Sequence, residues 1–164
     1  MAERMMRKDK KKRVLFFDDE PFISKALANS LTLFEWDVTF VDNINDLFKE
    51  LKNNSFDILL LDIMAPIPEM ENSNVSFSEK EINEMDNGMN TGIVLARKIW
   101  EFNNNIPILF LTAIAVEHQQ ESINHFTDEG KTCYCLRKPE PAIKVQDTLN
   151  QLLNLKNKKK YNAE

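Results

Sequence analysis

Short apolar runs alternate along this chain with longer stretches in which apolar residues recur at helical spacing. The runs include Val14–Phe17, Ile58–Leu61 and Ile108–Leu111, and none of them contains a polar residue. Such runs are typical of parallel strands that are buried on both faces of a sheet. The pattern therefore predicts an α/β fold with strands at about 13–18, Asp37–Val41, Asp57–Leu61, Pro107–Leu111 and Cys133–Arg137.

Five helices are predicted to follow these strands. Pro21 fits the first turn of the first helix, and Asn43 can cap the second. The third helix is expected at about 91–103, the fourth at about 117–128, and the fifth from near Pro141. The residues expected to face the core are Phe22, Ile23, Ala26, Leu27, Ser30, Leu31 and Phe34; Ile44, Leu47, Phe48 and Leu51; Ile93, Ala96, Ile99 and Trp100; Ile123 and Phe126; and Val145, Leu149, Leu152 and Leu153.

Residues 65–90, here called the insert, interrupt this alternation with two prolines and many polar residues. Long loops of this kind are usually functional or disordered. Ser78 and Glu81 match a capping box, and Met85 continues a helical spacing, so an ordered helix and a disordered acidic loop are both open. We expect the insert to tune partner choice and not to hold the fold, because it lies outside every predicted core element.

The net charge of −5 hides a segregated charge distribution. Residues 1–13 hold seven Lys or Arg against two acids, and residues 156–164 hold four Lys against one acid. The insert holds six acids against one Lys. We therefore divide the chain into a basic N-terminal tail (1–12), one domain (13–155) and a basic C-terminal tail (156–164), with the insert at the opposite end of the sheet from both tails.

The bulk properties point to one globular domain away from the membrane. A length of 164 residues and a hydrophobic content of 43% suit one full core. No apolar run approaches the ~20 residues of a membrane helix, and the basic N-terminus precedes too few apolar residues for a signal peptide. We expect a cytoplasmic protein in which Cys133 and Cys135 are reduced, packed thiols.

Reactive side chains directly follow four of the predicted strands. They are Asp18 and Asp19, Asp62, Thr112 and Lys138. The C-terminal ends of parallel strands form the binding crevice of an open α/β sheet, so these groups are expected to meet. Carboxylates are ligands for Mg²⁺, and a carboxylate can also be a nucleophile that becomes an aspartyl phosphate. A helix cap is the ordinary role of one such Asp, but the whole set predicts Mg²⁺-assisted phosphoryl chemistry.

With these reactive residues in this order along the chain, the sequence resembles a bacterial-type response regulator receiver domain. The matching segments are VLFFDDEP at 14–21, DILLLDIMAP at 57–66, TGIVLARKIW at 91–100, IPILFLTAIA at 106–115 and LRKP at 136–139. The resemblance spans most of residues 13–155. It implies a flavodoxin-like, doubly wound, five-stranded parallel sheet of order 2-1-3-4-5 with helices on both faces.

The resemblance also implies a role for each reactive residue. Asp62 would be the phosphoacceptor, and Asp19 and Asp62 would be direct Mg²⁺ ligands. Asp18 would act mainly through water, and the backbone carbonyl of Met64 would complete the protein ligands. The residues that would contact the phosphoryl group are Thr112 and Lys138.

One departure from the family concerns the signalling switch. Receivers usually carry Tyr or Phe three residues before the Lys, whereas this chain has Cys135 there and Tyr134 one residue earlier. A shift of one residue moves a side chain to the other face of a strand, which leaves the usual coupling of Thr112 to an aromatic switch open. Glu140 also stands where an aromatic often follows the Lys-Pro.

Two other protein classes, one an enzyme and one a cofactor binder, fit the sequence less well. A haloacid-dehalogenase-type enzyme needs a second acid at position 64, where this chain has Met, and a flavodoxin-like binder needs a Gly-rich phosphate loop, whereas the chain has three glycines. We expect a stand-alone receiver in a two-component phosphorelay, not an enzyme, that takes a phosphoryl group from a sensor histidine kinase or a histidine phosphotransfer protein. It would signal to a protein target as a monomer or weak dimer, without binding nucleic acid directly. The alternative is a phosphorylation-independent adaptor with the same fold.

Overall fold

The computed structural model describes residues 10–69 and 73–161. Its centre is a five-stranded sheet of order β2-β1-β3-β4-β5 in which every neighbouring pair is parallel. The strands are β1 (Arg13–Phe17), β2 (Asp37–Val41), β3 (Ile58–Asp62), β4 (Ile108–Thr112) and β5 (Cys133–Arg137). This arrangement confirms the predicted fold class and strand order.

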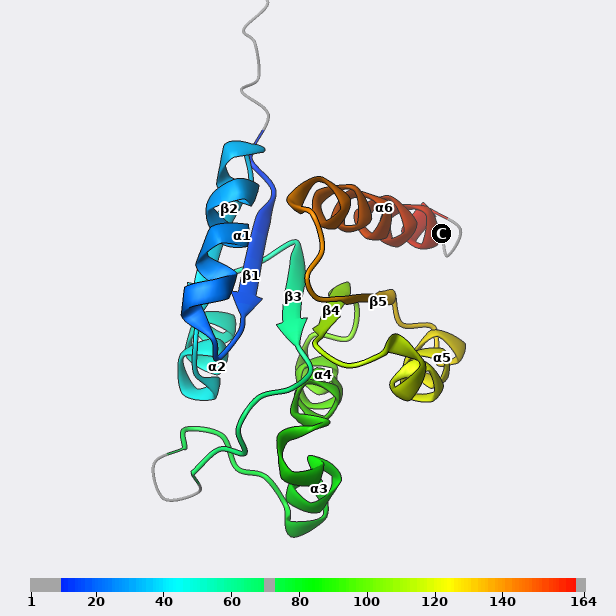
Figure 1. Ribbon diagram of the computed structural model, residues 1–164. Helices are drawn as coiled ribbons and strands as arrows, with labels where there is room; N and C mark the ends of the chain where they lie inside the picture. Colours follow the sequence, from blue (N-terminus) through cyan, green and yellow to red (C-terminus); the bar gives the residue numbers. More distant parts are fainter. Residues whose placement is uncertain (1–9, 70–72, 162–164) are drawn as a thin grey trace, which may run out of the picture.

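Helices cover both faces of the sheet (Figure 1). They are α1 (Pro21–Leu33), α2 (Ile44–Asn53), α3 (Glu79–Glu84), α4 (Thr91–Phe102), α5 (Gln120–Asp128) and α6 (Ala142–Tyr161). Val14 and Phe16 share one core cluster with α1 and α6, whereas Leu15 and Phe17 share the other with α2, α4 and α5. Successive strand residues thus pack against opposite helical layers, which explains why the strands are apolar throughout.

The inward face of α1 differs from the predicted one. Leu31 is buried as predicted, but Phe22 and Ile23 are 96% and 65% exposed, Ala26 and Phe34 are also exposed, and the unpredicted Ser24 and Ala28 are buried. The hydroxyl of Ser24 donates a hydrogen bond of 2.5 Å to Asp18, which holds this polar residue against the sheet edge. Apolar spacing alone cannot detect a helix face that is set by a buried hydrogen bond.

The insert packs into the core, so the expectation that it does not hold the fold is wrong. Phe77 and Met85 are buried, and both belong to the core cluster that contains α4. The predicted capping box of Ser78 and Glu81 is present at the start of α3. The reason lies in α4, whose first six residues are all buried and therefore need cover on the side away from the sheet.

Ion pairs attach α3 to α4 around this apolar contact. Lys98 lies 2.9 Å from Glu81 and also stacks over the ring of Phe77, with 4.9 Å from Nζ to the ring centroid. Arg97 pairs with Glu84. The alternative of a disordered loop is therefore excluded for the described part of the insert that contains α3.

The two basic ends are only partly described. Residues 1–9 of the N-terminal tail lie outside the described residues. The C-terminal tail predicted at 156–164 is helical as far as Tyr161, as the last turns of α6. Lys159 donates a hydrogen bond of 3.0 Å to the carbonyl of Gly130, which contributes to the continuation of the helix beyond its last buried residue, Leu153. In the part of the chain that the structure covers, no helix combines the length and the apolar character needed to cross a membrane.

Candidate functional site

The predicted site residues meet at the C-terminal edge of the sheet. Asp18 directly follows β1, Asp62 ends β3, Thr112 ends β4 and Lys138 directly follows β5. Asp62 is in register with Leu111, and Thr112 is in register with Arg137, so the ends of three neighbouring strands are nearly level. The parallel sheet thereby brings together residues that lie up to 120 positions apart in sequence.

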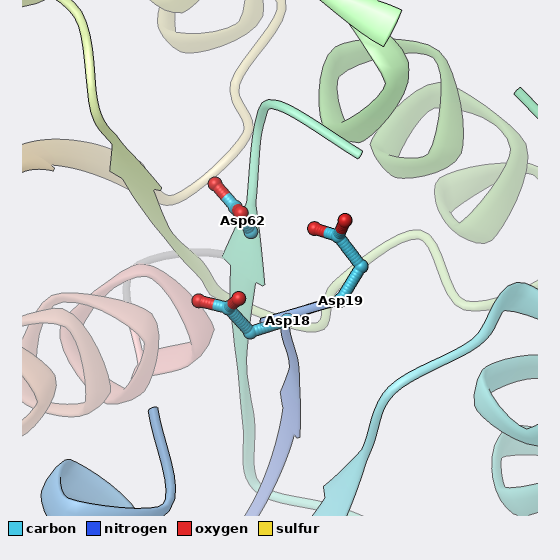
Figure 2. A group of neighbouring side chains, drawn as sticks. All are labelled: Asp18, Asp19 and Asp62. Carbon is cyan, nitrogen blue, oxygen red and sulfur yellow. The ribbon is translucent and has the colours of Figure 1, made fainter. Parts of the chain in front are cut away.

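Three carboxylates form the centre of the site (Figure 2). One carboxylate oxygen each from Asp18, Asp19 and Asp62 lies within 4.8 Å of the other two. Asp18 and Asp62 are buried, and Asp19 is partly exposed. Asp18 is fixed by Ser24 and by a 2.9 Å hydrogen bond from the amide of Glu20, and the amide of Met64 donates to Asp62 at 3.2 Å.

Lys138 supplies one positive charge to this cluster. Its Nζ donates to Asp18 Oδ2 at 2.7 Å and to Asp62 Oδ2 at 3.0 Å. Burial alone would lower the pKa of Lys138, but the hydrogen bond to Asp18 and the charges of Asp62 and Asp18 more than offset this, so its pKa is raised. Lys138 is therefore a cation at neutral pH and bridges two of the three acids.

One ammonium group does not balance the three carboxylates, and the pKa values of Asp62 and Asp19 are raised accordingly. Burial raises the pKa of Asp62 to about 6, despite the opposing charge of Lys138, and the charge of Asp18 raises it further. Burial also raises the pKa of Asp19, with smaller contributions from Asp18 and Glu20. Three crowded carboxylates with one ammonium fit a hard divalent cation such as Mg²⁺, which binds carboxylate oxygens. The carbonyl of Met64 stays a predicted ligand.

Thr112 is fully buried beside Lys138. Its hydroxyl accepts a hydrogen bond of 3.2 Å from the amide of Ile114, and its carbonyl accepts one of 2.7 Å from the amide of Lys138. The backbone therefore links the ends of β4 and β5 directly. Because of this bond, a displacement of the backbone after β4 would also displace the backbone after β5.

Contacts of the first turn of α4 with the site and with the insert were not found from the sequence. A Cβ on Gly92 would lie 2.2 Å from the carbonyl oxygen of Asp62, so only glycine fits there. The hydroxyl of Thr91 donates to the carbonyl of Ala65 at 2.6 Å, which anchors the end of the insert beside its start. A glycine within the first turn of an apolar helix was the available signal, because Gly is unfavourable in a helix unless close packing requires it.

A second link that the sequence did not reveal joins the insert to the loop after β4. Gln119 is buried, and its side-chain amide donates to the side-chain oxygen of Asn90 at 3.2 Å. Asn90 precedes α4 but does not cap it with its side chain. The Thr112 loop and the insert are therefore connected through a partly buried polar contact.

The strand β5 confirms that this chain lacks an aromatic at the usual inward position. Cys135 is buried, whereas Tyr134 is 53% exposed. Burial raises the pKa of Cys133 to about 11 and that of Cys135 to about 12, so both are thiols at neutral pH. Both cysteines are free, as expected for packed, reduced side chains.

Comparisons with known proteins agree with this geometry. No family model matches the chain. The response regulator receiver protein CpdR of Brucella abortus (strain 2308) is 26% identical over 141 residues, which cover 86% of this chain and 93% of the relative.

Solved structures share the fold over nearly the whole chain. A CheY-like receiver domain protein from Methanospirillum hungatei JF-1 superposes with a TM-score of 0.67 at 17% identity, covering 92% of this chain and 99% of that one. A receiver protein from Sinorhizobium medicae WSM419 gives a TM-score of 0.65 at 22% identity, covering 90% and 98%. With the sequence relative, these likenesses show that the chain has the fold of response regulator receiver domains.

Proposed function

We propose that Asp62 accepts a phosphoryl group from a phosphohistidine of a sensor histidine kinase or a histidine phosphotransfer protein. A carboxylate oxygen of Asp62 would form the bond to phosphorus while the bond from phosphorus to the imidazole nitrogen breaks. The imidazole leaves with that electron pair. The phosphorylated domain would then signal through contacts with a target protein, which places its action in the cytoplasm with the donor.

This proposal rests on the charged side chains that surround Asp62. This buried carboxylate lies between two further carboxylates and a lysine that already touches it. With a pKa of about 6, Asp62 is mostly ionised at neutral pH and is available as a nucleophile. A bound Mg²⁺, held by Asp18, Asp19 and Asp62, would supply charge neutralisation for the phosphoryl oxygens.

Two other residues are placed to hold the phosphoryl group. Lys138 can keep its hydrogen bond to Asp18 while its contact with Asp62 is replaced by one with a phosphoryl oxygen. The hydroxyl of Thr112 accepts a bond from Ile114, and within residues 10–69 and 73–161 its proton has no hydrogen-bond acceptor. It can therefore donate to a phosphoryl oxygen, provided that the loop after β4 moves toward Asp62.

Incubation with acetyl phosphate and Mg²⁺, followed by intact mass measurement, tests the proposal. Wild type is expected to gain one phosphate, and Asp62→Asn none. Asp57→Asn is a matched control, because Asp57 precedes the same strand at its opposite end and lies exposed. Absence of label on wild type would contradict phosphoryl transfer.

The second candidate, a phosphorylation-independent adaptor, is favoured by one observation, the buried Cys135 where an aromatic switch would be expected. An adaptor would bind its target equally well in the wild-type and Asp62→Asn forms. Comparing target binding by these two proteins with and without acetyl phosphate separates the candidates.

A further inference from the structure

A cavity of about 240 Å³ lies between the first five residues of the insert, 65–69, and the start of α2. Its walls are mostly apolar and come from Phe17, Ile44 and Ala65 together with Pro66, Ile67 and Pro68 of the insert. Asp19 lines the cavity and also belongs to the carboxylate cluster around Asp62. The cavity therefore opens directly beside the phosphoacceptor.

Hydrogen bonds hold both walls in place. The amide of Asn74 donates to Asn45 at 2.8 Å, which ties the insert to the start of α2. Ala65 donates its amide to Gly88 at 3.2 Å and accepts the hydroxyl of Thr91. These hydrogen bonds attach the insert to α2 and α4 on either side of the described part of the cavity wall.

The rim of the cavity carries negative charge without a cation. Asp19, Asp42 and Glu69 line it, and no Lys or Arg is among its lining residues. Across residues 10–69 and 73–161, none of these three carboxylates takes part in an ion pair. Asp42 accepts a hydrogen bond of 3.1 Å from the side-chain amide of Asn43. By contrast, Glu81 and Glu84 of the same insert are paired with cations of α4.

We propose that this cavity binds an arginine side chain of the protein that docks over Asp62. The aliphatic stem would lie along Ile44 and Ile67, and the guanidinium would contact Asp42 and Glu69. Arginine suits a half-apolar cavity better than lysine does, because a guanidinium is more weakly hydrated and can bond two acceptors at once. The proposed function is the basis for assigning this arginine to the protein that carries the phosphohistidine.

The position of the cavity supports a docking partner as its occupant. A protein that brings a phosphohistidine to Asp62 would approach the neighbouring Asp19, which also lines the cavity. The insert supplies one complete wall, so the cavity would let this chain discriminate between donors that differ in one side chain. The insert would then contribute both to the core and to partner choice.

Titration with Nα-acetylarginine methylamide, followed by NMR of the amide groups in saturating Mg²⁺, tests the inference. Saturable shifts are expected at Asn45 and Ala65. The neutral citrulline analogue is expected to bind at least about fivefold more weakly, and the lysine analogue more weakly than arginine. Equal binding of the citrulline analogue would overturn the proposal.

The double variant Asp42→Asn/Glu69→Gln should weaken arginine binding at least about fivefold. The matched control is Glu101→Gln/Asp128→Asn, which removes the same charge from exposed positions outside the cavity and should bind like wild type. Equal affinities of the two double variants would contradict a local contact. Acetyl phosphate labelling separates the two proposals: labelling of wild type without arginine binding refutes only the cavity, whereas arginine binding without labelling refutes only phosphoryl transfer.

Discussion

Asp62 combines burial, a like-charged neighbour and a single shared cation. Its carboxylate is 3% exposed, and it shares the ammonium of Lys138 with Asp18. Ionising it is therefore less favourable than ionising an exposed carboxyl group, which is why its pKa rises to about 6. A residue tuned in this way would bind a divalent cation at the expense of its own proton.

This tuning predicts a pH-dependent stability effect of Asp62→Asn in metal-free protein. Because the pKa is about 6 when folded and about 3.8 when unfolded, the folded state holds the proton more tightly, and stability is lost as pH rises through that window. Asn removes this loss, so the variant should be more stable than wild type by on the order of 3 kcal/mol at pH 7. The difference should shrink toward pH 4.

Urea unfolding with EDTA, repeated from pH 4 to pH 8, measures this difference. Added Mg²⁺ should stabilise wild type and leave Asp62→Asn nearly unchanged. A stability difference that does not vary with pH would mean that the folded-state pKa of Asp62 is not raised.

The lifetime of a phosphorylated form should depend on Met64 and Ile114. In receiver domains, which this chain resembles, the residues two positions beyond the phosphoacceptor and two beyond the Thr lie closest to the path of the attacking water. Both side chains here are partly buried and apolar, and neither can orient water. We expect Met64→Asn and Ile114→Gln to shorten the half-life of phosphorylated protein at constant Mg²⁺ after donor removal. Faster decay in wild type than in both variants would refute this account.

At the residue scale, the sequence predicted the groups that directly follow strands. Asp18, Asp62 and Lys138 could be placed because a parallel sheet fixes where strand ends meet. Ser24 and Gln119 could not, because each owes its role to a single hydrogen bond with a side chain outside its own helix. The sequence contains no pattern that specifies such a bond.

At the scale of elements, the strands and the start of α3 were predictable, but the packing of the insert was not. The capping box is a local pattern of two residues, and it is present as predicted. The burial of Phe77 and Met85 depends on α4 lacking a polar face over Thr91–Ala96. The consecutive apolar residues of that helix were the available signal for a covering element.

Packing of the insert predicts a large difference between two neighbouring methionines. Met85 is fully buried in the core, whereas Met89 is 36% exposed. Met85→Ala should lower the free energy of unfolding by about 2–4 kcal/mol, because it leaves a cavity under α3, and Met89→Ala by less than about 1 kcal/mol. Denaturant unfolding of both variants provides the comparison, and similar small losses would show that the insert does not stabilise the core.

At the scale of the whole molecule, the charges are separated along the strands. The arrowheads of β1 and β3 point toward the end where α3 lies, and β1 begins at the opposite end (Figure 1). Lys159 at the end of α6 contacts the turn before β5, so the lysine-rich helix end also lies at that opposite edge. The negative potential therefore surrounds the site and would steer a positively charged partner surface toward Asp62.

The most direct test of the central claim is chemical identification of the phosphorylated residue. After incubation with acetyl phosphate and Mg²⁺, reduction with borohydride converts an aspartyl phosphate to homoserine, which peptide mass spectrometry locates. The account predicts homoserine at position 62 and at no other acid, and its loss when hydroxylamine precedes the reduction. A phosphate found on Asp18, Asp19 or a hydroxyl side chain would contradict it.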